Sequence, residues 1–221
     1  MGCARFGLSG AGLSFSATCA AVFLIAIGEF DRRRGFEKLQ EFARLAFWFV
    51  VLTNTLTVLF QLCGRSSRPL VDFQLLAADH WLHLSTAGTV HWVIHHPALG
   101  AVPAVCYTLV PGLILLSLLI PVVSGRKEAG RRFLVSLTFG ALLTAVVFWI
   151  YPALGPWAQG SYLPTAAQSA NTAYFALLRA PGPVRIDFIN CGIVAFPSFH
   201  VVLAVLPVFA LWSNRVLRPF V

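Results

Sequence analysis

The stretch FPSFH, residues 196–200, opens a run without charged residues that lasts to Asn214. Proline is favoured at the first position of a helix, because its N–H is not needed there and its φ is already helical. If Pro197 begins a helix, the N–H groups of Ser198 and of the two residues after it lack carbonyl partners within that helix. The helix dipole makes such groups a site for an anion such as phosphate. Ser198 adds a hydroxyl donor and His200 a proton carrier, so the stretch predicts phosphoryl chemistry at a membrane surface.

The composition of the chain is typical of a membrane protein. Of its 221 residues, 58% are hydrophobic and only 11% are charged, and the mean hydropathy is +0.79. A helix that crosses a membrane needs ~20 apolar residues, and we expect the first candidate to be a retained span rather than a cleaved signal peptide. The sequence therefore predicts an all-α fold, a multi-pass helical bundle that forms a single membrane domain over residues 1–221. The five predicted spans are residues 8–28, 45–63, 98–123, 133–151 and 196–212.

The positions of the basic residues predict the orientation of these spans. Eleven of the 16 Lys and Arg residues lie in the connections after the first and third spans and in the tail after the fifth. These regions share one side if the N-terminus is outside, and the positive-inside rule makes that side cytoplasmic. The net charge of +8 is then a topology signal, and no nucleic-acid partner is expected. Ser198 and His200 would lie at the outer (periplasmic or extracellular) face of a plasma (inner) membrane.

Two loops on the predicted outer side hold most of the polar residues. The first covers residues 64–97, and the apolar side chains of its stretch 69–82 share one helix face. This pattern favours a helix lying in the membrane interface with Trp81 as an anchor. The second loop, residues 152–195, is broken by Gly and Pro into short pieces and leads directly into Ser198. Long ordered loops are often functional.

Histidines and cysteines leave alternatives open. The histidines of the first loop either lie at the headgroup level or share a zinc or copper ion, as pairs three or four residues apart on a helix can. Because acidic and cysteine partners are missing, the interface is favoured and no metal is expected. The five cysteines lack a metal-binding spacing and are interpreted as small apolar side chains, with a Cys63–Cys191 disulfide as the alternative. The histidines in question are His80, His83, His91, His95 and His96.

The residues around Ser198 also resemble a signature of a known family. The segment GIVAFPSFH, residues 192–200, resembles the second signature of the type 2 phosphatidic acid phosphatase (PAP2) superfamily. Its Pro-Ser-x-His form is similar to the branch that includes inositol phosphorylceramide synthases. The resemblance is strongest over residues 65–212, about two thirds of the chain. Further stretches similar to that branch are RPLVD at 68–72, HPAL at 96–99, YPALGP at 151–156 and RID at 185–187.

The resemblance implies an enzyme of lipid metabolism that works without a metal or another cofactor. In such enzymes one histidine attacks phosphorus and forms a phosphohistidine, while the signature histidine protonates the leaving alkoxide. His200 would be this general acid, and Ser198 with the backbone N–H of Phe199 would bind phosphate oxygens. Arg185, which matches the family position, and as a weaker candidate Arg179, would neutralise the charge on these oxygens. The implied partners are a lipid phosphate or phosphorylated lipid headgroup and the surrounding membrane lipids.

Two signatures of the family are not matched. The third signature is an Arg followed by a His and then by an Asp four residues later, in a sixth span. It does not occur in the sequence, so no histidine matches the nucleophile. The first, Lys-x6-Arg-Pro, lacks its lysine before Arg68. We therefore expect a C-terminally truncated member that is inactive as this chain alone. The alternative is a non-catalytic membrane protein that binds a phosphate-bearing ligand or partner. A transporter is less favoured, because paired interrupted helices are not evident.

Overall fold

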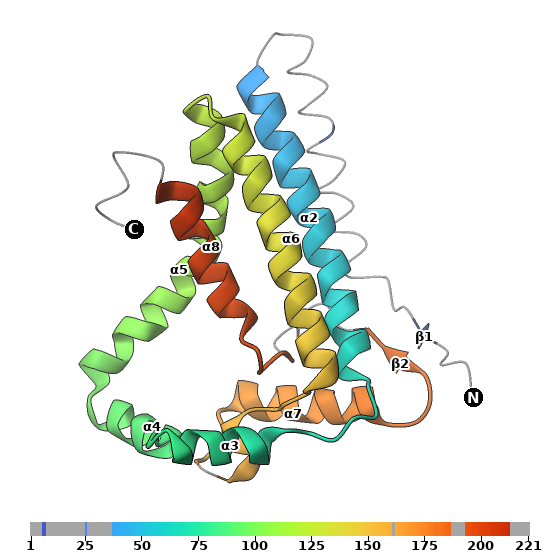
Figure 1. Cartoon of the computed structure of the whole chain (residues 1–221), viewed down its shortest axis with the longest axis vertical. Coiled ribbons are helices and arrows are strands. Elements are labelled where there is room, and N and C mark those ends of the chain that lie inside the picture. The colour runs from blue at the N-terminus through green and yellow to red at the C-terminus, as the bar shows by residue number, and fades with distance from the viewer. Residues whose placement is uncertain (1–5, 8–24, 26–36, 161, 187–192, 213–221) are drawn as a thin grey trace. The chain divides into compact units, whose positions relative to one another are not determined.

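The computed structural model describes residues 6–7, 25, 37–160, 162–186 and 193–212, and these residues are largely helical (Figure 1). The all-α fold class predicted from the sequence is confirmed. Two-residue strands, β1 (Phe6–Gly7) and β2 (Val184–Arg185), pair in parallel. The helices of this part of the chain are α2 (Glu37–Gly64), α3 (Asp72–Trp81), α4 (Thr86–His95), α5 (Pro97–Val123), α6 (Lys127–Ile150), the 3₁₀-helix η1 (Pro156–Gln159), α7 (Ala166–Arg179) and α8 (Phe199–Trp212).

Three helices of the described chain are long and apolar enough to cross a membrane, namely α2, α5 and α6. They correspond to the second, third and fourth predicted spans. Both α2 and α6 begin earlier than predicted, at Glu37 and Lys127, because their charged first turns continue the helix instead of ending it. The first predicted span, residues 8–28, lies outside the described residues except for residue 25.

The fifth predicted span, residues 196–212, is corrected by the structure. α8 begins at Phe199 and has 14 residues, because residues 195–198 form a turn. At ~1.5 Å per residue a helix of this length measures about 21 Å, and the hydrocarbon core of a bilayer is ~30 Å thick. Within the described residues, which stop at 212, α8 is a shorter apolar helix, and a complete fifth span stays a prediction.

The chain divides into two compact units. We call Met1–Gly7, Val58–Leu109 and Leu143–Phe199 the first unit, and Leu8–Thr57, Val110–Leu142 and His200–Val221 the second unit. Each of the three long helices contributes one end to each unit.

In the second unit, glycines on α6 lie close to its neighbouring helices. A Cβ added to Gly130 would lie 2.8 Å from Cδ1 of Leu45 on α2, and one added to Gly140 would lie 2.7 Å from Cγ1 of Val202 on α8. Small residues at such contacts let apolar helices approach closely. The surrounding core includes the buried side chains of Leu118, Phe133 and Leu137.

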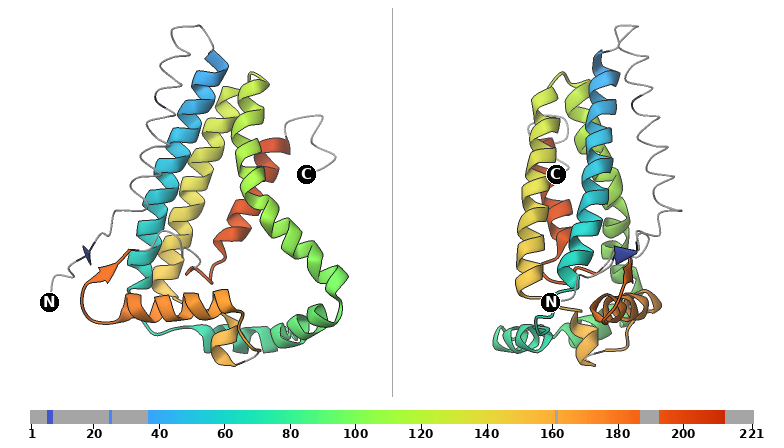
Figure 2. Two further views of the ribbon diagram at one scale, coloured as in Figure 1. Left: turned by 180° about the vertical axis from the view of Figure 1, so that it is seen from behind. Right: turned by 90° about the vertical axis from the view of Figure 1, so that its right-hand side faces the viewer.

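In the first unit, α7 runs crosswise at the ends of α2 and α6, and α3 and α4 lead from there to the start of α5 (Figure 2). The buried aromatic rings of Phe148 on α6 and Phe175 on α7 have centroids 6.2 Å apart. A Cβ added to Gly64, the last residue of α2, would lie 3.4 Å from Phe175 and from Ile193, and 3.5 Å from Phe148. One core therefore joins α2, α6, α7 and the segment before α8.

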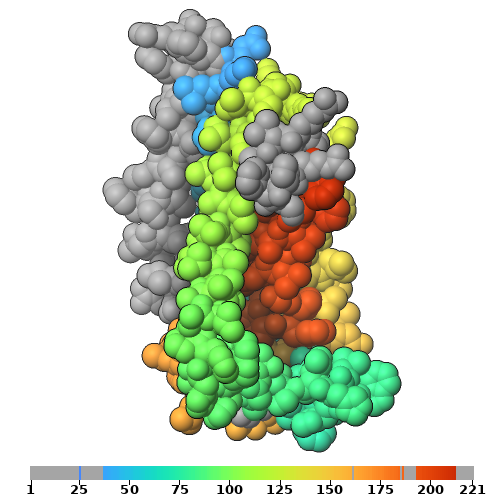
Figure 3. All heavy atoms as spheres, turned by 90° about the vertical axis from the view of Figure 1, so that its left-hand side faces the viewer, coloured from blue at the N-terminus to red at the C-terminus, as the bar shows by residue number. Residues whose placement is uncertain are grey.

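The outer surface of the first unit is formed in part by α3, α4 and the first half of α5 (Figure 3). Large apolar side chains on α3 and α4 are exposed, including Phe73 (70%), Trp81 (81%), Trp92 (50%) and Ile94 (68%). Exposed apolar side chains, where they form a large patch, mark contact with a membrane or another protein. The helix predicted within residues 69–82 is confirmed as α3, and its location in the membrane interface stays a prediction.

Candidate functional site

The signature residues lie where the turn of residues 195–198 passes into α8. Ser198 immediately precedes the helix, a position where serine is strongly preferred. Pro197 lies inside the turn, so the prediction that it is the first helical residue is wrong. The N-terminal end of the helix is kept but moved by two residues, so that Phe199 is the first helical residue, a position whose N–H has no partner within the helix. Both Ser198 and His200 are exposed.

The first residue of α8 packs against the last part of α2. The ring of Phe199 meets the ring of Phe60 edge-on, with centroids 5.2 Å apart. Phe60 lies one turn before Gly64, where α2 ends. The turn that carries Ser198 is therefore held near the C-terminal end of α2, which is also where the loop with Arg65 begins.

A buried carboxylate joins two of the stretches that resemble the family, RPLVD and YPALGP. Asp72 is only 4% exposed, and its oxygens accept hydrogen bonds from the N–H of Leu154 at 3.0 Å and of Gly155 at 2.7 Å. The N–H of Val71 donates to the carbonyl of Pro152 at 3.0 Å. Gly155 has a φ of 123°, a conformation that glycine tolerates best. The loop after α6 is thus fixed beside the loop after α2.

Sequence reasoning assigned no role to Asp72. The available signal was a single acidic residue within an apolar stretch, which must find donors if it is buried. Those donors lie 82 and 83 residues further along the chain, so the sequence could not identify them.

Arginine side chains link the end of α2 to the end of α7. Nη2 of Arg65 donates to the carbonyl of Gly182 at 2.6 Å, and Nη2 of Arg179 donates to the carbonyl of Arg68 at 2.5 Å. The guanidinium of Arg68 lies 4.7 Å from the centroid of the Trp149 ring, in cation–π contact. Three arginines therefore meet at one junction, and sequence reasoning had selected only Arg179.

Two predictions depend on residues outside the described part. For Arg185, the stronger arginine candidate, the structure describes only its backbone in β2, so its contact with phosphate stays a prediction. Cys63 lies near the end of α2, whereas Cys191 is among residues 187–192, which are not described. The disulfide alternative is therefore untested.

The five other histidines lie on α3 and α4 or directly beside them. The rings of His91 and His95 are 4.2 Å apart, and Nδ1 of His95 lies 2.8 Å from the carbonyl oxygen of His91. The ring of His96 stacks on Trp92 with centroids 4.5 Å apart. Within the described ranges, no group of three or more His, Cys, Asp or Glu side chains is arranged to hold a metal ion.

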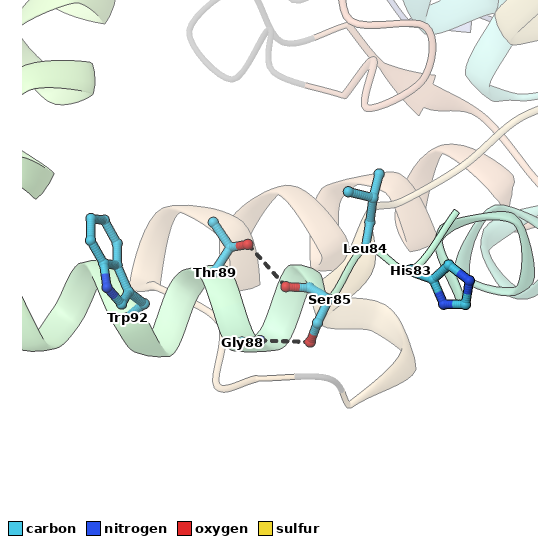
Figure 4. Close-up of a pocket in the computed structure, with 6 residues that line it drawn as sticks. All are labelled: His83, Leu84, Ser85, Gly88, Thr89 and Trp92. Atoms are coloured by element: carbon cyan, nitrogen blue, oxygen red, sulfur yellow. Dashed lines mark hydrogen bonds between the residues drawn. The ribbon is translucent and has the colours of Figure 1, made fainter. Parts of the chain in front are cut away.

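An open hollow of about 390 Å³ lies where α3 gives way to α4 (Figure 4). Its polar groups form hydrogen bonds that cap the start of α4. Oγ of Ser85 accepts from the N–H of Gly88, and the hydroxyl of Thr89 donates to the Ser85 carbonyl, both at 3.0 Å. No signature residue lines the hollow, so it is not the candidate site. Its lining residues are His83, Leu84, Ser85, Gly88, Thr89 and Trp92.

The described residues combine long apolar helices with a serine and a histidine at a helix start. A family model of the PAP2 superfamily matches residues 73–221, about two thirds of the chain, including Ser198 and His200. The chain therefore belongs to the PAP2 superfamily. No match was found among curated proteins or among solved structures.

Proposed function

We propose that this protein acts on a lipid phosphate or a phosphorylated lipid headgroup, as a PAP2-type phosphatase or phosphotransferase of the branch that resembles inositol phosphorylceramide synthases. The family match supports the class of reaction. The observation that carries the proposal is the position of Ser198 directly before α8, with His200 as the second residue of that helix. This order offers a phosphate a hydroxyl, the backbone N–H of Phe199 and a proton donor within three residues.

In the proposed reaction, the Ser198 hydroxyl and the N–H of Phe199 hold phosphate oxygens at the positive end of α8. Arg185, or as second candidate Arg179, stabilises the charge that develops on those oxygens. A histidine nucleophile forms a P–N bond while the ester P–O bond breaks, and His200 gives its proton to the departing alkoxide. Water or an alcohol then takes the phosphoryl group, which completes hydrolysis or transfer.

The nucleophile is not assigned, because no histidine of the chain is followed by an aspartate four residues later. We infer that the 221-residue chain binds the phosphate but turns it over slowly by itself. The same observation favours the second candidate function, a non-catalytic membrane protein that binds a phosphate-bearing ligand or partner. In both cases the site is proposed to face the outer side of a plasma membrane, with the N-terminus outside.

The test is turnover by the purified chain in a non-ionic detergent with a metal chelator present. Phosphate release is measured from short-chain phosphatidic acid and from nitrophenyl phosphate, with and without a co-expressed span from a relative that carries His-x3-Asp. We expect little turnover alone and clear turnover with the added span. The His200→Ala variant should then lose ~10²–10⁴-fold on the lipid but less on nitrophenyl phosphate, whose leaving group needs no proton.

The matched control is Ser67→Ala, which removes an exposed hydroxyl outside the signature and should leave turnover unchanged. Equal turnover by the parent and His200→Ala on the lipid would reject His200 as the acid. Fast turnover by the chain alone would mean that one of the five histidines on α3 and α4 is the nucleophile. Phosphate binding without turnover, even with the added span, would favour the non-catalytic function.

A further inference from the structure

We propose that Arg65, Ser66 and Arg179 form a second phosphate-binding site, at the junction between the end of α2 and the end of α7. This site goes beyond the proposed function, because it lies outside the Ser198 signature and requires no turnover. It also assigns Arg179, the second arginine candidate above, to a different phosphate group from the one held at α8.

Two buried donors at this junction have no acceptor. Oγ of Ser66 and Nη1 of Arg179 are buried and lack a hydrogen-bond partner among the described residues. Buried polar atoms without a partner are rare in native proteins, and each one indicates a missing ion or water or a functional role. Neither residue is buried as a whole, because both have intermediate exposure.

The arginines are held in place by backbone carbonyls rather than by acids. One nitrogen of Arg65 is fixed by Gly182 at 2.6 Å, and one nitrogen of Arg179 is fixed by the carbonyl of Arg68 at 2.5 Å. Each side chain thus crosses to the loop that follows the other helix. Ser66 follows Arg65 directly, and its N–H donates to the carbonyl of Cys63 at 3.1 Å, which closes the turn at the end of α2. Backbone carbonyls therefore hold the side chains of Arg65 and Arg179 at this junction.

Carboxylates of the described residues do not neutralise Arg68 or Arg179. Neither arginine forms an ion pair with a described residue, and the ion pairs of the described residues lie within or between the N-terminal parts of α2 and α6. Asp72, the next acidic residue along the chain after Arg68, is bonded to the N–H groups of Leu154 and Gly155. The positive charge of Arg179 is therefore available to an external anion.

A phosphate group fits these donors by its chemistry. The planar guanidinium group binds phosphate oxygens in a bidentate manner, and a serine hydroxyl can donate to a further oxygen of the same tetrahedral group. The phosphate comes either from a lipid headgroup or from solution. Both sources offer the same oxygens, so the experiment has to distinguish them.

The test uses the full 221-residue chain in a non-ionic detergent and measures the Kd for inorganic phosphate by calorimetry at constant ionic strength. We expect Arg179→Gln to raise the Kd about 10- to 100-fold, since a hydrogen bond to a charged group is lost. Ser66→Ala should raise it about 2- to 10-fold. Arg179→Lys keeps the positive charge but loses the planar guanidinium group that binds two oxygens, so it should give an intermediate Kd. This variant provides a test even if Arg179→Gln folds poorly. The matched controls Ser67→Ala and Arg132→Gln change exposed residues and should leave the Kd unchanged.

The same titration separates this site from the signature. Ser198→Ala should bind phosphate at the junction as tightly as the parent does, and this result supports the second site whatever becomes of the proposed function. If Ser198→Ala abolishes binding while Ser66→Ala does not, the phosphate belongs to the signature and the second site is rejected. If the parent binds no phosphate but Asp187→Asn does, the occupant is a carboxylate of the chain itself, which also rejects it.

Nanodiscs then identify the source of the phosphate. In discs of phosphatidylcholine with phosphatidic acid, a loss of affinity for inorganic phosphate relative to discs of phosphatidylcholine alone indicates that the lipid headgroup occupies the site. An unchanged affinity indicates phosphate from solution. The proposal is wrong if phosphate binds no more tightly than chloride in both kinds of disc and in detergent.

Discussion

The basic residues at the two ends of α2 have different partners. At the start of α2, in the second unit, Glu41 binds Nη2 of Arg44 at 2.6 Å and Nε of Arg131 at 2.9 Å. At the end of α2, in the first unit, Arg68 and Arg179 contact aromatic rings and a backbone carbonyl, and neither pairs with a described acid. Glutamates neutralise the first group within the chain, and we propose that the second group binds an external anion. The comparison indicates that, of the two ends of α2, the C-terminal end is the one suited to bind a phosphate.

The largest expected effect is a difference in labelling from outside the cell between the C-terminal end of α2 and the connection between α5 and α6. In a background without native cysteines, Ser67→Cys should react fully with a membrane-impermeant maleimide added to intact cells, and Arg132→Cys should not react. This follows from the positive-inside rule, and both positions are exposed. Gly130 is a poor position for the label, because an added Cβ would lie 2.8 Å from Leu45. Labelling of Arg132→Cys in intact cells would reverse the proposed orientation.

The next largest effect tests whether the buried carboxylate of Asp72 stabilises the fold or instead pairs with the arginines of the first unit. Asp72→Ala leaves the N–H groups of Leu154 and Gly155 without an acceptor, which should lower the free energy of unfolding by roughly 2–4 kcal/mol. Thermal unfolding in detergent measures the change. Asp72→Asn should cost less, because the amide oxygen still accepts a hydrogen bond.

The control for this prediction is Asp79→Ala, which removes a single hydrogen bond, accepted from Thr86 at 3.1 Å, and should cost about 0.5–1.5 kcal/mol. Phosphate affinity of Asp72→Asn should equal that of the parent. A tighter phosphate complex in Asp72→Asn would show instead that the Asp72 carboxylate competes for the arginines.

These two ends also show which features the sequence could predict. The long helices α2, α5 and α6 follow from hydropathy, which is a local property. Ser198 and His200 belong to one short motif, so their position at a helix start could also be predicted from the sequence. The proline rule alone misplaced that start, because propensity is a weak prior that tertiary structure overrides.

The contacts of Asp72 and Arg179 could not be predicted, because they join residues far apart in the chain. Arg179 reaches a carbonyl 111 residues before it, and Arg65 reaches one 117 residues after it. No pattern within a single helix encodes such pairs. The family resemblance included both RPLVD, which ends at Asp72, and YPALGP, whose N–H groups bind Asp72. It did not indicate that the two stretches contact each other.

A smaller effect is expected from the neutralised end of α2. Glu41 is 7% exposed, and Glu41→Gln removes the acid shared by Arg44 and Arg131. Its two partners are partly exposed, so water compensates much of the loss, and we expect about 1–2 kcal/mol of destabilisation. Thermal unfolding gives the value, and phosphate affinity should not change. A change in phosphate affinity would contradict the separation of the two ends.

The smallest effect concerns the exposed pair at the same end. Glu37 lies 3.3 Å from Nζ of Lys127, and its side chain is 80% exposed. Exposed ion pairs contribute ~0–1 kcal/mol and are screened by salt, so Glu37→Gln should lower stability by less than about 0.5 kcal/mol. That difference should vanish at ~1 M salt, where the Debye length falls to ~3 Å, whereas the loss in Glu41→Gln should largely persist. If the two variants respond to salt alike, burial does not distinguish the pairs, and the start of α2 is held no more firmly than any surface contact.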